Sequence, residues 1–282
     1  MVASAGAAQP VVTVFVSILS QEYVVEKIAG NTVRVITMIP KGSEPVTYEP
    51  KPSQMKELAV AKAYFSIGVP FEKAWIPKVR ASNKTLRIIP VDKNIRKIPI
   101  QNHTCGTKGH GHSHIGHEKE MLDPHIWSSP TLMKTIAKNT YNGLVQVAPQ
   151  HKEHYRKNLQ AFLKEIDKLD DEIRAEVSKM PKDAAFMVFH PAWGYFTNEY
   201  GLEQIAIEID GKEPKPAQLK SVIQTAKNHH IKVIFIQPQF SQKTAQLVAD
   251  AIGAKVLVAD PLAKNWAENL RRQTVQFRKA VQ

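Results

Sequence analysis

The sequence predicts an α/β protein of two lobes, each a mostly parallel sheet with flanking helices, joined by one long connector helix. In both halves of the chain, short apolar segments rich in β-branched residues alternate with segments of helical periodicity, which is typical of βαβ units. Between the halves, residues 150–179 have an almost uninterrupted helical pattern. The length of 282 residues fits about two domains. We place the first lobe at residues 11–130, the helical connector at 131–180 and the second lobe at 181–282.

The first lobe opens with the apolar, β-branched segment VVTVFVSI, which is typical of a buried strand. Gly30-Asn31 end the helix that follows, and Pro52 lies near the first turn of a later helix. In parallel sheets, ligands bind beyond the carboxyl ends of the strands, and the loop at 40–50 follows such an end. The predicted strands are 11–18, 33–39, 63–67 and 86–91, and the predicted helices are 21–29, 51–61 and 71–81.

Two helical segments, 131–147 and 150–179, follow the first lobe. The second carries an apolar stripe at a spacing of three to four residues, which indicates packing against a core. Thirty residues of helix measure about 45 Å, so we interpret this segment as a rigid connector between the lobes. A coiled-coil dimer is the alternative, but about four heptads with a loop at each end argue against it, and we expect a monomer. The stripe consists of Tyr155, Leu159, Phe162, Ile166, Leu169, Ile173 and Val177.

The alternation of strands and helices resumes after Pro181. One predicted strand leads directly into His190-Pro191, and the last predicted strand leads into Asp260-Pro261. Each proline fixes the backbone just beyond a side chain that can bind a ligand. The predicted strands are 185–189, 204–209, 232–236 and 255–259, the predicted helices are 216–229, 244–252 and 266–281, and 211–216 is a loop.

The composition restricts the class of partner. The net charge is +12 with a pI of about 9.6, a balance that can indicate nucleic acid or an anionic membrane. Here the basic residues are interleaved with acidic ones along the predicted helices, and no RNA- or DNA-binding motif accompanies them. We therefore interpret the charge as a solvated surface and expect no nucleic-acid partner.

The N-terminal residues favour a location outside the cytoplasm. The start, MVASAGAAQP, is rich in small residues and resembles the remnant around a signal-peptide cleavage site with an added initiator Met. We expect a periplasmic protein, with a ragged cytosolic N-terminus as the alternative. No uninterrupted apolar run reaches the roughly 18 residues that a membrane span needs.

A histidine-rich tract at 103–117 is the most unusual feature of the chain. Interspersed glycines weaken both helix and strand there, so we expect a mobile loop. Many neutral imidazoles on such a loop collect borderline divalent metal ions weakly. The single cysteine, Cys105, lies within the tract and rules out an intramolecular disulfide. The histidines of the tract are His103, His110, His112, His114 and His117.

A separate, fixed metal site is predicted at the strand ends. His125 stands where the glycines stop and an apolar, aromatic segment begins, and His190 and Asp260 end strands of the second lobe. Taken singly, a histidine at a strand end is more often scaffolding, and an Asp before proline more often caps a turn. Together, two imidazoles and a carboxylate form a suitable ligand set for Zn²⁺, with Mn²⁺ as the alternative.

These motifs together make the sequence recognisable over nearly its whole length, from Val12 to the last helix. The chain resembles the metal-specific solute-binding proteins of ABC importers, the zinc- and manganese-binding group called ZnuA/TroA-like. The resemblance implies two lobes joined by one long helix, a metal ion bound between them, delivery to a membrane permease, and no catalysis. It carries the family's ligands over to His125, His190 and Asp260. The matching segments are SILSQEYVVEKIAG, MIPKGSEPVTYEPKPSQMKEL, YFSIGVPFEKAW, the histidine-rich tract, DPHIWSSP, FHPAWGYF, DGKEPKPAQL and ADPL.

The chain departs from the family pattern at one position. Val46 stands in Pro-Val-Thr-Tyr-Glu-Pro where the family usually has a histidine, and valine cannot coordinate a metal. The fourth ligand is then water, Glu44, Glu49 or a histidine of the tract. An open position also suits a catalytic zinc, so a zinc hydrolase with Glu49 or Glu208 as general base is one alternative function. A metal-dependent adhesin is another.

Overall fold

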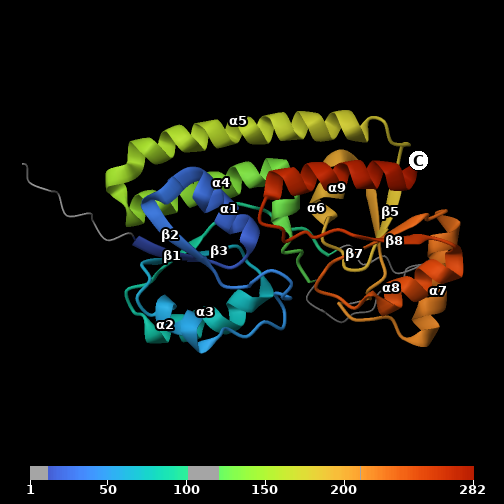
Figure 1. The fold of residues 1–282 in the computed structure, drawn as a ribbon, viewed down its shortest axis with the longest axis horizontal. Coiled ribbons are helices and arrows are strands. Elements are labelled where there is room, and N and C mark those ends of the chain that lie inside the picture. Colours follow the sequence, from blue (N-terminus) through green and yellow to red (C-terminus); the bar gives the residue numbers. More distant parts are fainter. Residues whose placement is uncertain (1–11, 101–120, 210) are drawn as a thin grey trace, which may run out of the picture.

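The computed structural model describes residues 12–100, 121–209 and 211–282, and within them two parallel sheets form the two lobes (Figure 1). The first sheet has the order β2-β1-β3-β4 and the second has the order β6-β5-β7-β8. Every strand pair in both sheets is parallel. The strands are β1 (Val12–Val16), β2 (Val33–Thr37), β3 (Ala63–Ser66), β4 (Arg87–Pro90), β5 (Ala185–Val188), β6 (Glu203–Ala206), β7 (Val233–Ile236) and β8 (Lys255–Val258).

Helices flank both sheets, and the longest of them runs along both lobes in Figure 1. The helices are α1 (Leu19–Ala29), α2 (Pro52–Leu58), α3 (Pro70–Ser82), α4 (Pro130–Val147), α5 (Lys152–Val177), α6 (Gly194–Tyr200), α7 (Pro216–Asn228), α8 (Gln242–Ile252) and α9 (Trp266–Val281). Short 3₁₀ helices occur at η1 (Gly30–Thr32), η2 (Ile126–Ser128) and η3 (Pro149–His151). None of these helices is long and apolar enough to cross a membrane.

The predicted stripe on α5 determines how the lobes are held together. All of its residues except Val177 are buried, because the helix packs against α1 and α4 on one lobe and against α9 on the other. A single hydrophobic cluster extends from Phe15 on β1 to Phe277 on α9 and includes residues of both sheets. Burial of this apolar surface therefore stabilises the arrangement of the lobes as well as each lobe itself.

The two-lobe α/β prediction is confirmed, and the predicted strands and helices occur within a few residues of their expected ends. One helix was not predicted. Helix α6 has seven residues and follows directly on the His190-Pro191 motif. Its sequence, GYFTNEY, begins with glycine and is rich in aromatic residues that have only average helix propensity, so tertiary packing rather than local preference forms it. Tyr195 and Phe196 of its first turn are buried.

Candidate metal centre

His190 lies just beyond the carboxyl end of β5, where its backbone is held on both sides. Gln237, just beyond the end of neighbouring β7, donates its side-chain amide to the His190 carbonyl (2.6 Å) and accepts from the His190 amide (3.2 Å). The ring Nδ1 of His190 lies 2.5 Å from Glu208 Oε2. Glu208 is 6% exposed, and its own backbone amide donates to the Phe189 carbonyl. The imidazole is therefore fixed from two neighbouring strands.

His125 precedes η2 and is held in the same way by a carboxylate. Asp123 is fully buried, and its Oδ1 lies 2.8 Å from the His125 amide nitrogen and 2.7 Å from the His125 ring Nδ1. The backbone of Asp123 is also anchored, since its amide donates to the Ile98 carbonyl and its carbonyl accepts from the Tyr195 hydroxyl (2.8 Å). His125 itself is 9% exposed.

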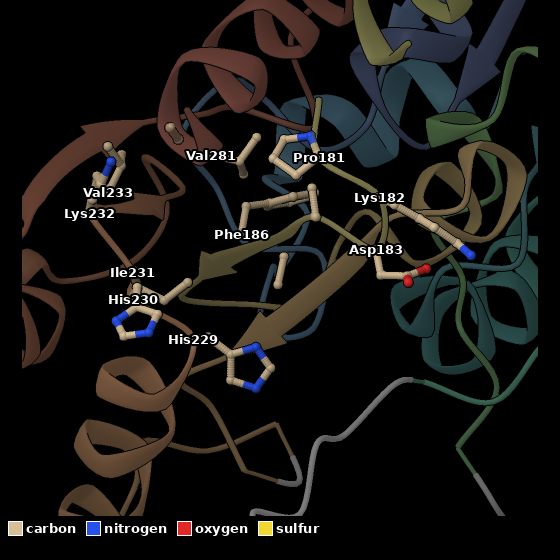
Figure 2. Close-up of a pocket in the computed structure, with 13 residues that line it drawn as sticks. Pro181, Lys182, Asp183, Phe186, His229, His230, Ile231, Lys232, Val233 and Val281 are labelled. Carbon is tan, nitrogen blue, oxygen red and sulfur yellow. The ribbon is translucent and has the colours of Figure 1, made fainter. Parts of the chain in front are cut away.

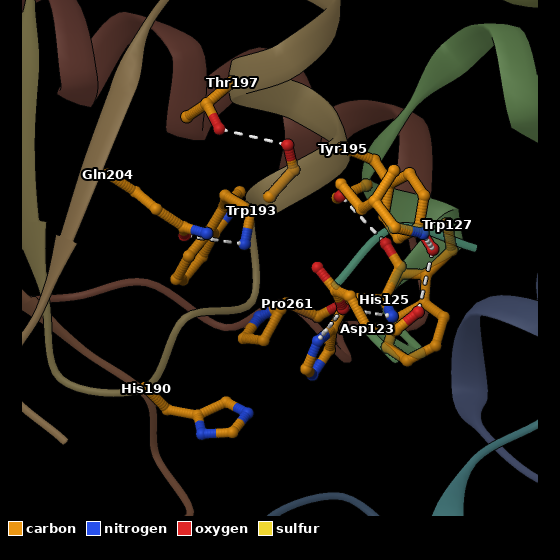
Figure 3. A network of polar contacts seen from close by, with 12 residues as sticks. Asp123, His125, Trp127, His190, Trp193, Tyr195, Thr197, Gln204 and Pro261 are labelled. Atoms are coloured by element: carbon orange, nitrogen blue, oxygen red, sulfur yellow. Dashed lines mark hydrogen bonds and ion pairs between the residues drawn. The ribbon is translucent and has the colours of Figure 1, made fainter. Parts of the chain in front are cut away.

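The two histidine rings meet where the lobes adjoin. Their centroids are 5.1 Å apart and the ring planes are at 70°, and Figure 3 shows the ring of His190 turned toward His125. An ionised carboxylate only accepts hydrogen bonds, so a neutral ring that faces it carries its proton on Nδ1 and keeps the lone pair on Nε2. A carboxylate behind a histidine is the usual arrangement around a metal-binding imidazole. The pair can therefore offer two neutral Nε2 atoms to one ion.

Asp260 lies beyond β8. A hydrogen bond to the residue after it joins this part of the chain to the segment that follows His125. The indole Nε1 of Trp127 donates to the Pro261 carbonyl at 2.8 Å. The Oδ1 of Asp260 accepts from the Leu262 amide (2.9 Å) and from Gln239 Nε2 (3.4 Å). Across the described ranges, no three His, Cys, Asp or Glu side chains are grouped closely enough to hold a metal ion. The structure thus brings together the two histidines, and Asp260 as a third ligand stays a prediction.

The other predicted ligands belong to the loop that contains Val46 and to the histidine-rich tract. Val46 is 61% exposed. In the same loop Glu44 is half-buried and accepts from the Thr47 hydroxyl at 3.3 Å, and Glu49 is exposed. The tract histidines His103, His110, His112, His114 and His117, with Cys105, lie outside the described residues.

Sequence reasoning missed Asp123 as the partner of His125, and considered Glu208 only as a general base. Asp123 had a readable signal, because it lies two residues before His125 and its carboxylate returns to the amide of residue i+2, as in an Asx turn. Glu208 had none, because it comes within reach of His190 only when β6 pairs with β5.

Three hydrogen bonds near this site connect the two lobes. The Tyr195 hydroxyl accepts from the Ile98 amide (3.2 Å) while it donates to the Asp123 carbonyl. Burial raises the pKa of Tyr195 to about 12, so the hydroxyl keeps its proton at neutral pH. The Trp266 indole donates to the Trp127 carbonyl at 2.7 Å. Figure 3 shows several of these side chains around the histidines.

A cavity of about 270 Å³ lies elsewhere in the second lobe (Figure 2). It is lined by Asp183, before β5, and by His229, His230 and Lys232, before β7. These residues precede the strands that His190 and Gln237 follow, so the cavity lies at the opposite edge of the sheet. Its polar lining is exposed to solvent, and it is not part of the histidine site.

Comparison with known proteins identifies the family of this chain. The family model described as "Zinc-uptake complex component A periplasmic" (ZnuA) matches residues 14–280. The high-affinity zinc uptake system protein ZnuA of Bacillus subtilis is 30% identical over 227 residues, which is 80% of this chain and 70% of that protein. A crystal structure of ZnuA superposes with a TM-score of 0.87 at 37% identity, covering 96% of this chain and 100% of the other.

The zinc-binding protein AdcA of Streptococcus pyogenes is 28% identical over 246 residues, or 83% of this chain. The match covers 47% of AdcA, so this chain spans about half the length of that relative. The family model, in contrast, covers the described structure from β1 to α9. The chain belongs to the ZnuA family of zinc-uptake solute-binding proteins.

Proposed function

We propose that this protein captures Zn²⁺ between its lobes and delivers it to the membrane permease of an ABC importer. The observation that carries this proposal is the pair of histidines, each with its Nδ1 held by a buried carboxylate and its Nε2 available. Such a pair binds a metal ion without needing to reorganise either ring. The names of the relatives, which are zinc-uptake and zinc-binding proteins, support zinc as the cargo.

The proposed ligands are His125, His190 and Asp260. The Trp127–Pro261 hydrogen bond keeps the Asp260 segment next to the segment of His125, so a change in the Asp260 side chain can complete the set. Val46 supplies no donor, which leaves the fourth position to water, Glu44, Glu49 or a tract histidine. Two imidazoles favour zinc over the harder Mn²⁺, which prefers oxygen ligands.

We also propose that the chain binds without turnover and acts outside the cytoplasm as a monomer. No sequence feature beyond the open ligand position supports hydrolysis, and Glu208, the one buried candidate for a general base, already holds the His190 ring. A periplasmic protein of this family meets zinc before the permease does. The predicted role of the tract at 103–117 is to collect zinc weakly and raise its concentration near the fixed site.

The direct test is elemental analysis of protein purified without chelator or added metal, followed by competition titration. We expect one tightly bound zinc ion per chain, and His190→Ala should abolish tight binding. His229→Ala is the matched control, because His229 is exposed and precedes β7 at the opposite edge of the sheet. An unchanged isotherm for His190→Ala would reject the proposed ligand set.

Deleting residues 103–117 tests whether the tract provides the weak zinc sites and the fixed site the tight one. The deletion should remove the weak sites in calorimetry and leave one tight site. Zinc affinity at the remaining site should decrease as the solution is acidified, since a protonated imidazole cannot coordinate. A deletion variant without a tight site would contradict the proposal.

A further inference from the structure

Two buried polar atoms near the site lack a partner among the described residues. One is Asp123 Oδ2, the second oxygen of the carboxylate that holds His125, and the other is Gln204 Nε2 on β6. Both side chains are 0% exposed. An unpartnered carboxylate oxygen and an unpartnered amide donor are each costly in a protein interior, so their occurrence together requires an explanation.

A hydrogen bond to the side-chain oxygen of Gln204 determines how its amide group is oriented. Its Oε1 accepts from the backbone amide of Trp193 at 3.1 Å, as the dashed line in Figure 3 shows. The NH₂ group must therefore be the end that remains free. A donor and an acceptor, which are complementary, are thus both buried here.

Gly194 lies against both atoms. A Cβ atom placed on Gly194 would lie 2.6 Å from Asp123 Oδ2 and 3.3 Å from Gln204 Nε2. Both unpartnered atoms therefore lie close to the same side of the Gly194 backbone, and close enough to each other for one water molecule to bridge them. Gly194 has no positive φ, so backbone conformation does not explain the glycine.

We propose that a buried water beside Gly194 bridges the two atoms, accepting from Gln204 Nε2 and donating to Asp123 Oδ2, and that Gln204 is thereby a positioning residue for His125. The inference builds on the proposed function, because His125 matters as a metal ligand. With Oδ2 held by the water, the carboxylate cannot turn about its Cβ–Cγ bond. Oδ1 then stays on the amide and ring Nδ1 of His125.

The segment that contains β6 also orients His190. Glu208, which holds His190, lies two residues beyond the end of β6, and Gln204 lies within it. One segment of the second lobe, residues 204–208, thus controls the ring of His190 directly and the ring of His125 through the water and Asp123. Zinc binding across the lobes requires both rings at once, so this segment links the two ligands.

Two variants test the bridge. Gly194→Ala places a methyl group against Asp123 Oδ2, where it displaces the bridge, and Gln204→Leu removes the donor. In the metal-free protein, we expect both to speed hydrogen exchange of the His125 amide and ring Nδ1 protons selectively, and to weaken zinc binding about tenfold or more, the usual effect of losing such a partner. The matched control is Gln21→Leu, which removes another buried amide with hydrogen bonds of its own, in the first lobe.

The outcomes separate a positioning role from a structural one. A general loss of stability would speed exchange of all protected amides in Gln204→Leu and Gln21→Leu alike, and that result would overturn the proposal. So would a high-resolution crystal structure of the metal-free wild type with no water between the two atoms. If the wild type binds no zinc, the proposed function fails, while the exchange and crystallographic results on metal-free protein still decide whether the bridge exists.

Discussion

At the scale of single residues, the first lobe contains a buried acid that holds neighbouring backbone, much as the acids at the histidine site hold the two imidazoles. Glu72, on the first turn of α3, is 5% exposed. Its Oε1 accepts from the Ile67 amide (2.8 Å) and the Ser17 hydroxyl, and its Oε2 accepts from the Gly68 amide (2.7 Å). The carboxylate thus joins the chain beyond β1 to the chain beyond β3, at the edge of the sheet that adjoins the site.

Glu72 should make stability depend on pH. Burial raises its pKa to about 6 against hydrogen bonds that lower it, so the folded protein binds this proton more tightly than the unfolded chain does. The contribution to the free energy of unfolding is therefore largest below about pH 4.5 and is lost as the pH rises through about 6. In urea titrations, wild type should lose about 2 kcal/mol relative to Glu72→Gln as the pH rises from about 4 to about 7.5. A difference that stays constant from pH 4 to 7.5 would contradict the prediction.

Glu208 should contribute to metal affinity without touching the metal. Replacing Glu208 with Leu removes the acceptor for His190 Nδ1, so the ring can turn or carry its proton on Nε2, and zinc affinity should fall about 10- to 100-fold. Glu208→Gln should show a smaller loss, because its carbonyl oxygen still accepts from Nδ1. Competition titration measures both, with Glu153→Gln as an exposed carboxylate control. Equal affinities for all variants would exclude a positioning role.

At the scale of elements, the short helix α6 fastens the second lobe to the chain around His125. Tyr195→Phe deletes one hydroxyl that serves both the Ile98 amide and the Asp123 carbonyl. Since those groups would be left unpaired, we expect the free energy of unfolding to fall by about 1–3 kcal/mol. Urea denaturation checks the loss, and amide exchange should locate it at residues 98 and 123–125. An increase in exchange confined to α6 would show that the hydroxyl supports only its own helix.

The same elements show how far the sequence can predict the fold. The stripe on α5 and the β-branched strands were readable because burial of one face imposes a regular spacing. Helix α6 was not readable, because its aromatic residues are buried by contacts distant in sequence. His190 was predicted from its position at a strand end, and His125 from its position where the glycines stop and an apolar, aromatic segment begins. Of the two carboxylate partners, Asp123 is placed by a local turn and Glu208 by strand pairing. Only the turn leaves a pattern in the sequence.

At the scale of the whole molecule, the lobes share more than a connector. Helix α5 has 26 residues, about 39 Å of helix, and packs on both lobes. The hydrophobic cluster is continuous from one sheet to the other, and Trp127 is hydrogen-bonded at both its indole and its carbonyl to residues beyond β8. Opening the lobes as a hinge would expose this apolar surface and break these hydrogen bonds together.

Zinc binding should therefore leave the overall shape almost unchanged. The expected adjustment is local, at the Asp260 side chain and the loop of Val46, because these move without disturbing the shared core. Small-angle scattering of the variant lacking residues 103–117 should give radii of gyration with and without zinc that differ by less than about 1 Å, as in other pre-organised sites. Apo protein incubated with Mg²⁺, which does not favour imidazole ligands, controls for ionic effects. A zinc-specific contraction of several ångströms would show that the lobes close as rigid bodies, and that the shared core is not the restraint inferred from its packing.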